Sequence, residues 1–213
     1  MAVQGLFENP GVKRVLLLPS PAPPLKKTTT PLEDRVAMTR LCFEEQIPGL
    51  PRLRGSVSIE HSELSRAEKN PHGPTYTFDT LLELKNEIPK LAFVIGTDQL
   101  IQLPRWHRFP ELLDLCHWIV LNRQGQTSPH SLLSEWEASG LLKKTQSERG
   151  FSEWENLILC PTPAPAVSST QIRENFARKG VPPEKTLTPN VERYLMQRGI
   201  YGTSARTSSS DGK

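Results

Sequence analysis

Residues 168–173 (SSTQIR) have the types and spacing that suit a phosphate-binding helix start. Small hydroxyl residues such as Ser168, Ser169 and Thr170 are common at helix N-termini, where backbone N–H groups without helical partners can bind an anion. Arg173 would lie in the first turn and could donate two parallel hydrogen bonds to phosphate oxygens. The alternative is an ordinary Ser/Thr cap with a solvated arginine, and the hexapeptide alone leaves both open.

Two further groups of candidate residues follow apolar runs that are predicted to be strands. Gly96 would let a ligand approach the backbone closely, and Asp98 could accept a hydrogen bond from a ribose hydroxyl. Lys26 lies in a proline-rich segment that follows the first run, residues 15–18. Ligands of doubly wound sheets bind at the carboxyl ends of the strands, where these residues would lie. The alternatives are a plain turn with a helix cap after Gly96 and a solvated loop around Lys26.

Trp106 stands between Arg105 and His107 and offers a flat face for a heteroaromatic ring. The alternative is a tryptophan that anchors a loop to the core. The five histidines show no metal-ligand spacing, so a zinc site is not expected. The sequence contains neither a legible Ser-His-Asp or Cys-His pattern nor a Walker-type phosphate loop.

The bulk composition excludes several classes of protein. A chain of 213 residues with 36% hydrophobic and 23% charged residues suits a globular fold with a real core. A net charge of +3 argues against binding to nucleic acid mainly through charge. No apolar run approaches the roughly 18 residues of a membrane span, and the first ten residues do not resemble a signal peptide. The three widely spaced cysteines suit a reducing cytosol, so we expect a cytoplasmic protein whose oligomeric state stays open.

The apolar pattern predicts strands that alternate with helices. The expected strands cover residues 15–18, 57–59, 91–96, 118–121 and 157–160. The expected helices cover residues 32–45, 77–88, 98–103 and 109–115, with a further helix that begins at the SSTQIR segment. This alternation indicates an α/β fold with a parallel sheet covered on both faces, and the first strand is expected to be buried on both faces.

Two segments are expected to stand outside this alternation. Residues 124–150 are polar and loosely patterned, and we interpret them as an insertion with one helix near residues 131–139. Residues 203–213 are rich in serine and glycine and are expected to form a disordered tail after a single domain over residues 1–202.

Several of these segments occur together, in the same order, in a known family. The matching segments are PPLK at 23–26, GPTYTFDT at 73–80, GTD at 96–98, SSTQIR at 168–173 and the closing LTPNV…GIY at 187–201. They resemble the family motifs PPHK, GPSYTxDT, GAD, SSTxIR and LVPxxVxxYI…GLY, and Trp106 falls where the family carries a tryptophan. The chain therefore resembles the bacterial nicotinate-nucleotide adenylyltransferases over roughly residues 12–201.

The resemblance implies a Rossmann-like, doubly wound parallel sheet of the nucleotidyltransferase superfamily. It implies adenylyl transfer from ATP, accompanied by Mg²⁺, to nicotinate mononucleotide, which gives nicotinate adenine dinucleotide and pyrophosphate in NAD biosynthesis. The residues implied to bind ATP and its phosphates are Ser168, Ser169, Thr170, Arg173, Gly96, Asp98 and Lys26. Those implied to bind the nicotinate nucleotide are Tyr76, Thr77 and Trp106. The choice between nicotinate and nicotinamide stays open, and the PPLK and GPTYTFDT segments favour nicotinate.

The chain departs from the family pattern at two places. Leu25 stands where the family has histidine, beside Lys26. The family also begins with a central strand and an HxGH turn whose histidines contact the ATP phosphates, and these 213 residues contain no such motif. We therefore expect the natural start to lie upstream of Met1, and these residues alone to be inactive with no catalytic residue among them.

Two alternatives to this hypothesis stay open. One is a catalytically inactive nucleotide-binding relative that has lost the HxGH turn. The other is a different adenylyltransferase, such as one that acts on pantetheine phosphate, against which the YTFDT and SSTQIR segments argue.

Overall fold

The computed structural model describes residues 12–21, 30–44, 56–70, 73–123, 129–143, 152–154, 156–162, 169–184 and 186–202. The chain divides into two compact units. The first unit consists of Met1–Lys13, Ser20–Lys27 and His61–Ala166. The second consists of Arg14–Pro19, Thr28–Glu60 and Val167–Lys213.

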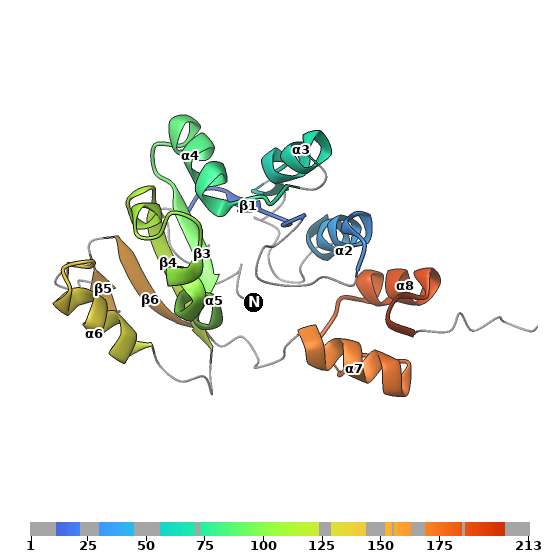
Figure 1. The fold of residues 1–213 in the computed structure, drawn as a ribbon. Coiled ribbons are helices and arrows are strands. Elements are labelled where there is room, and N and C mark those ends of the chain that lie inside the picture. The colour runs from blue at the N-terminus through green and yellow to red at the C-terminus, as the bar shows by residue number, and fades with distance from the viewer. Residues whose placement is uncertain are drawn as a thin grey trace, which may run out of the picture. The chain divides into compact units, whose positions relative to one another are not determined.

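The first unit contains a four-stranded sheet (Figure 1). Its strands, in the order β3-β4-β6-β5, are β3 (Ala92–Gly96), β4 (His117–Arg123), β6 (Leu157–Thr162) and β5 (Ser152–Trp154). The pairings β3–β4 and β4–β6 are parallel, as the sequence predicted. The antiparallel strand β5 was missed, because three residues are too few to show an apolar alternation, so the sheet is mixed rather than purely parallel.

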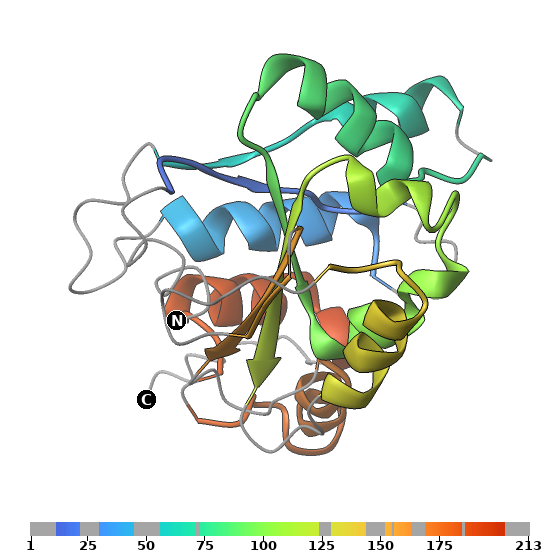
Figure 2. The same cartoon turned by 90° about the vertical axis from the view of Figure 1, so that its left-hand side faces the viewer.

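Helices of the first unit supply most of its core. They are α3 (Ser62–Lys69), α4 (Thr77–Glu87), α5 (Thr97–Gln102) and α6 (His130–Ala138), with short 3-10 helices at Leu103–Arg105 and Glu111–Asp114. Trp118 of β4 is fully buried in this core, and Leu81 and Leu100 of α4 and α5 are buried with it. Figure 2 shows α3 (teal) and α4 (green) next to each other.

The helix α6 confirms the one predicted near residues 131–139 but corrects the view of its surroundings. Leu133 and Trp136 are buried in the main core, and Trp136 packs on Phe109 with ring centroids 5.3 Å apart. Part of the polar segment 124–150 therefore belongs to the core, although residues 124–128 and 144–150 lie outside the described residues. Its interpretation as an insertion stays a prediction.

The second unit contains a parallel pair of strands and a group of helices. Strand β1 (Val15–Leu17) pairs with β2 (Val57–Ile59), and the helices are α2 (Leu32–Glu44), α7 (Ser169–Lys179) and α8 (Pro189–Arg198), followed by a 3-10 turn at Ile200–Gly202. The residues of β1 are only half-buried, so the prediction of burial on both faces was wrong. Phe176, Val191 and Leu195 form the small core of this unit.

The helix α8 was not predicted, although its end signals follow ordinary rules. Pro189 occupies the first turn, where its missing N–H group costs nothing. Gly199 ends the helix in the left-handed conformation, with φ of 63°. Within the described residues, the structure contains no helix whose length and apolar character would let it span a membrane.

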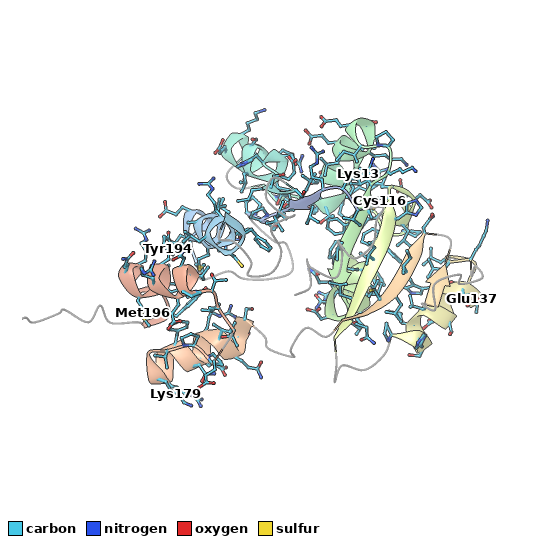
Figure 3. All side chains as sticks on the ribbon, turned by 180° about the vertical axis from the view of Figure 1, so that it is seen from behind. Lys13, Cys116, Glu137, Lys179, Tyr194 and Met196 are labelled. Carbon is cyan, nitrogen blue, oxygen red and sulfur yellow. The ribbon has the colours of Figure 1, made fainter. Side chains whose placement is uncertain are left out.

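A buried carboxylate joins α2 to α8 in the second unit. Asp34 is only 3% exposed and accepts hydrogen bonds from Tyr194 Oη at 2.7 Å and Arg198 Nε at 3.0 Å. Figure 3 labels Tyr194 on α8. The Tyr194 hydrogen bond, followed by the hydrogen bond and charge of Arg198, lowers the pKa of Asp34 against the opposing effect of burial. The ionised form of Asp34 is therefore favoured in the folded state.

The substitution Asp34→Asn tests this contact through the pH dependence of stability. A carboxyl group with a lowered folded-state pKa stabilises the fold above its unfolded pKa, which is about 4, and loses this effect as the pH falls through the folded value. We expect D34N to unfold at a lower urea concentration than the wild type at pH 7, and the difference to shrink below pH 4. The variant E33Q, which alters the exposed partner of Arg198, serves as the control. A difference that stays constant from pH 7 to pH 3 would contradict this assignment.

Candidate functional site

The turn after β3 is fixed by a side chain at the end of β4. Thr97 is 2% exposed, and its hydroxyl donates to Asn122 Oδ1 at 3.2 Å. The same hydroxyl lies 3.4 Å from the carbonyl oxygen of Leu121. Because Gly96 pairs in register with Leu121, the carboxyl ends of β3 and β4 lie together and these groups can meet. A hydrogen bond to the neighbouring strand β4 thus fixes the turn that a ligand was predicted to approach.

Gly96 leaves space that the Asp98 carboxylate occupies. A Cβ atom at position 96 would lie 2.6 Å from Asp98 Oδ1, so any side chain there would displace this carboxylate. The N–H group of Gly96 donates to Gln99 Oε1 at 3.3 Å, which ties the turn to the first residues of α5. Asp98 itself is exposed. The structure therefore places an exposed carboxylate next to the backbone of Gly96.

Aromatic and cationic side chains gather at the start of α4. The ring of Tyr76 stacks on His107 with centroids 4.2 Å apart and an angle of 21° between the planes. Phe78 meets the same imidazole edge-on at 6.3 Å, and Arg108 lies over the Phe78 ring with Cζ 4.0 Å from its centroid. Arg108 also forms an ion pair with Glu111. Stacking and cation–π contacts of this kind fix the orientation of flat rings.

Trp106 is half-buried next to this group and contacts the core. Its ring meets Phe93 of β3 edge-to-face, with centroids 6.4 Å apart. This contact supports the alternative that the tryptophan anchors its loop. An anchored indole can still present its remaining face to a ligand, so its role in stacking stays a prediction.

The first turn of α7 holds the predicted phosphate-binding residues of the second unit. Ser169 and Thr170 are exposed, and Arg173 Nη2 donates to Thr170 Oγ1 at 3.0 Å. The hydroxyl and the guanidinium thus lie together, as the SSTQIR spacing predicts. Ser168 and Lys26 lie outside the described residues.

The candidate residues are divided between the two units. Gly96, Asp98, Tyr76, Thr77 and Trp106 lie in the first unit, and Ser169, Thr170 and Arg173 lie in the second. Sequence reasoning missed Asn122, His107 and Arg108. The position of His107 directly after Trp106 was a weak signal, whereas nothing in the sequence marked Asn122 as a partner of Thr97.

Cys116 does not offer an activated nucleophile. Cys42, Cys116 and Cys160 are all half-buried thiols. Burial raises the pKa of Cys116 to about 12, against the smaller opposing effects of a backbone hydrogen bond at Phe93 and the charge of Lys85, so this thiol stays protonated at neutral pH. Across the described residues, no three His, Cys, Asp or Glu side chains are grouped closely enough to hold a metal ion.

The comparisons with known proteins agree with this fold and with these motifs. Residues 5–175 match the family described as "Cytidylyltransferase-like", which places the chain in this class of nucleotidyltransferases. A relative from Aeromonas hydrophila is 32% identical over 90% of this chain and 84% of its own length. Relatives from Serratia proteamaculans and Dehalococcoides mccartyi are each 31% identical, over 86% and 83% of their lengths. All three are named "Probable nicotinate-nucleotide adenylyltransferase", and the chain belongs to the nicotinate-nucleotide adenylyltransferase family.

Solved structures confirm the Rossmann-like fold. The Plasmodium falciparum nicotinic acid mononucleotide adenylyltransferase complexed with NaAD matches with a TM-score of 0.68, over 94% of this chain and 88% of that protein. The same enzyme complexed with APC matches with a TM-score of 0.65. Both are 14% identical to this chain, so they show the shared fold.

The substitution Thr97→Val tests whether the β4 end holds the turn after β3. Valine has nearly the shape of threonine but cannot donate to Asn122, so we expect a loss of about 1 kcal/mol in the free energy of unfolding. The variant T97S keeps the hydroxyl and serves as the control. Urea denaturation measures both. A loss with T97S equal to that with T97V would assign the effect to packing of the γ-methyl group instead.

Proposed function

We propose that the protein transfers the adenylyl group of ATP to nicotinate mononucleotide, which gives nicotinate adenine dinucleotide and pyrophosphate in NAD biosynthesis. The observation that carries this proposal is the similarity to relatives of that name over 84% and 86% of their lengths. The structural neighbour complexed with NaAD supports a product of the same chemistry. We further propose a cytoplasmic reaction, since the three cysteines are thiols.

The reaction needs positioning and charge neutralisation rather than a covalent intermediate. A phosphate oxygen of the mononucleotide attacks the α-phosphorus of ATP, the bond from the α-phosphorus to the bridging oxygen breaks, and pyrophosphate leaves with the electron pair. The developing negative charge is best stabilised by fixed donors and cations. Arg173 and the hydroxyls of Ser169 and Thr170 supply such groups, and we assign them to the ATP phosphates together with Ser168 and Lys26.

The remaining candidates are assigned to the two nucleosides. Gly96 and Asp98 are assigned to the adenosine part, because the exposed Asp98 carboxylate lies next to Gly96 and can accept a hydrogen bond from a hydroxyl. Trp106, Tyr76 and Thr77 are assigned to the nicotinate nucleotide, whose flat ring fits a site with aromatic walls. The stacking of Tyr76 on His107 holds one of these walls in a fixed orientation.

Magnesium would enter with ATP as part of the substrate. Mg²⁺ keeps several water ligands and is commonly held by substrate phosphates with one or two carboxylates, rather than by a cage of protein groups. We propose that the phosphates of ATP and water supply most of the ligands of this ion. Bound in this way, the ion would neutralise charge on the leaving pyrophosphate.

A turnover assay on the intact natural protein tests the proposed function. We expect ATP and nicotinate mononucleotide to yield nicotinate adenine dinucleotide and pyrophosphate in equal amounts, measured by chromatography and by pyrophosphate release. Nicotinamide mononucleotide and pantetheine phosphate, offered in competition, identify the preferred acceptor. Binding of ATP without product would contradict the proposal and favour an inactive nucleotide-binding relative.

The substitution Arg173→Gln tests the assignment of α7 to phosphate binding. Glutamine removes the positive charge and the forked donors, so we expect the KM for ATP to rise by about tenfold or more, since a hydrogen bond to a charged group contributes about 1.5–3 kcal/mol. The variant R178Q removes an exposed arginine from the last turn of the same helix and should leave the KM for ATP unchanged. Equal effects of both variants would indicate a general influence of charge rather than contact with the phosphates.

A further inference from the structure

A second buried carboxylate lies in the first unit, on a helix that the motifs do not include. Glu63 of α3 is 5% exposed, and its Oε1 accepts a hydrogen bond from Thr80 Oγ1 of α4 at 3.2 Å. The Ser20 hydroxyl also hydrogen-bonds with this carboxylate. The Thr75 hydroxyl is close enough to lower its pKa, although it makes no hydrogen bond of good geometry. Three separate segments therefore converge on one buried carboxylate.

Two of these contacts lead directly to the segment over residues 73–77. Thr75 belongs to this segment and is itself buried. Thr80, whose hydroxyl donates to Glu63, also donates its backbone N–H to the carbonyl oxygen of Tyr76 at 3.4 Å. A hydrogen bond from Thr80 thus fixes the backbone of Tyr76, while stacking on His107 fixes its ring. Thr80 is in turn hydrogen-bonded to the charged group Glu63.

Arg66 lies near the Glu63 carboxylate, but its charge does not fully offset the effect of burial on the pKa of Glu63. Arg66 of α3 contacts the Thr80 hydroxyl and pairs with Glu83 at 2.6 Å. Burial raises the pKa of Glu63, and the Thr80 hydrogen bond and the charge of Arg66 only oppose this effect. Burial of this carboxylate costs free energy, and hydroxyls from three segments surround it. We therefore infer that Glu63 orients these segments more than it stabilises the fold.

We propose that Glu63 is a positioning residue that orients residues 73–77 for binding of the acceptor nucleotide, acting through Thr80 and Thr75. This role rests on the proposed function, because Tyr76 and Thr77 are the residues assigned to that nucleotide. Glu63 touches neither substrate. It fixes the backbone from which the acceptor-binding side chains project.

Steady-state kinetics of E63A, E63Q and E83Q test this role. We expect E63A to raise the KM for nicotinate mononucleotide by about tenfold, since it removes a hydrogen-bond acceptor of charged type. The KM for ATP should change by less than about twofold, and E63Q, which keeps one acceptor oxygen for Thr80, should recover much of the loss. The variant E83Q removes the exposed partner of Arg66 and should match the wild type.

Hydrogen exchange over residues 73–80 separates failure of this role from failure of the proposed function. Faster exchange in E63A with no turnover by the wild type would reject the proposed function and keep the support of this segment by Glu63. Unchanged exchange would overturn the role of Glu63 whatever the wild type does. An equal rise in both KM values, or a lower melting temperature with unchanged KM values, would also overturn it. A selective rise in the KM for the acceptor with faster exchange would establish it.

Discussion

The in-register parallel pairing of β3 with β4 is the constraint on which the candidate site of the first unit depends. The register runs from Ala92 opposite His117 to Gly96 opposite Leu121, so the last residue of β3 lies level with Leu121, near the end of β4. The next residues along each chain, Thr97 and Asn122, are therefore brought within hydrogen-bonding distance. The fully buried Trp118 anchors β4 and meets Phe93 of β3 edge-to-face at 5.4 Å. A shift of one residue would move Phe93 off this face and would separate the two polar ends.

The two buried carboxylates show how the surroundings decide the charge state of one chemical group. Asp34 and Glu63 are buried to nearly the same extent. Asp34 accepts from a phenol and from a guanidinium that point directly at it, and its pKa falls. Around Glu63 the donors are mostly hydroxyls and Arg66 forms its ion pair with Glu83, so burial dominates and the pKa of Glu63 rises. The contacts of Asp34 favour an ion pair that joins two helices. Those of Glu63 favour a carboxylate that orients its neighbours although its burial costs free energy.

Apolar patterns predicted the elements whose positions depend on apolar burial. The strand β3 and the helix α4 were found within one residue at each end, because β3 is a short apolar run that ends at Gly96 and α4 has apolar residues at helical spacing. The helix α3 was missed for the opposite reason. Its sequence SELSRAEK has no apolar stripe, and its buried residue is Glu63, so hydrogen bonds across the fold hold it in place. Periodicity contains no information on contacts of that kind.

The candidate site likewise has a part that the sequence predicts and a part that depends on contacts between distant residues. Motifs identified side chains suited to meet a ligand, such as Tyr76 and Arg173, and the Thr170–Arg173 contact follows from helical spacing alone. The partners Asn122 and His107 come from other elements and have no fixed spacing from the residues they support.

The polar character of this support has a physical consequence. Apolar packing depends little on direction, whereas a hydrogen bond weakens steeply when its angle is wrong. A polar helix such as α3, held through Glu63, is therefore better suited than an apolar one to set the orientation of residues 73–77. The place of the polar helix α3 beside residues 73–77 thus fits a site at which the orientation of the backbone matters.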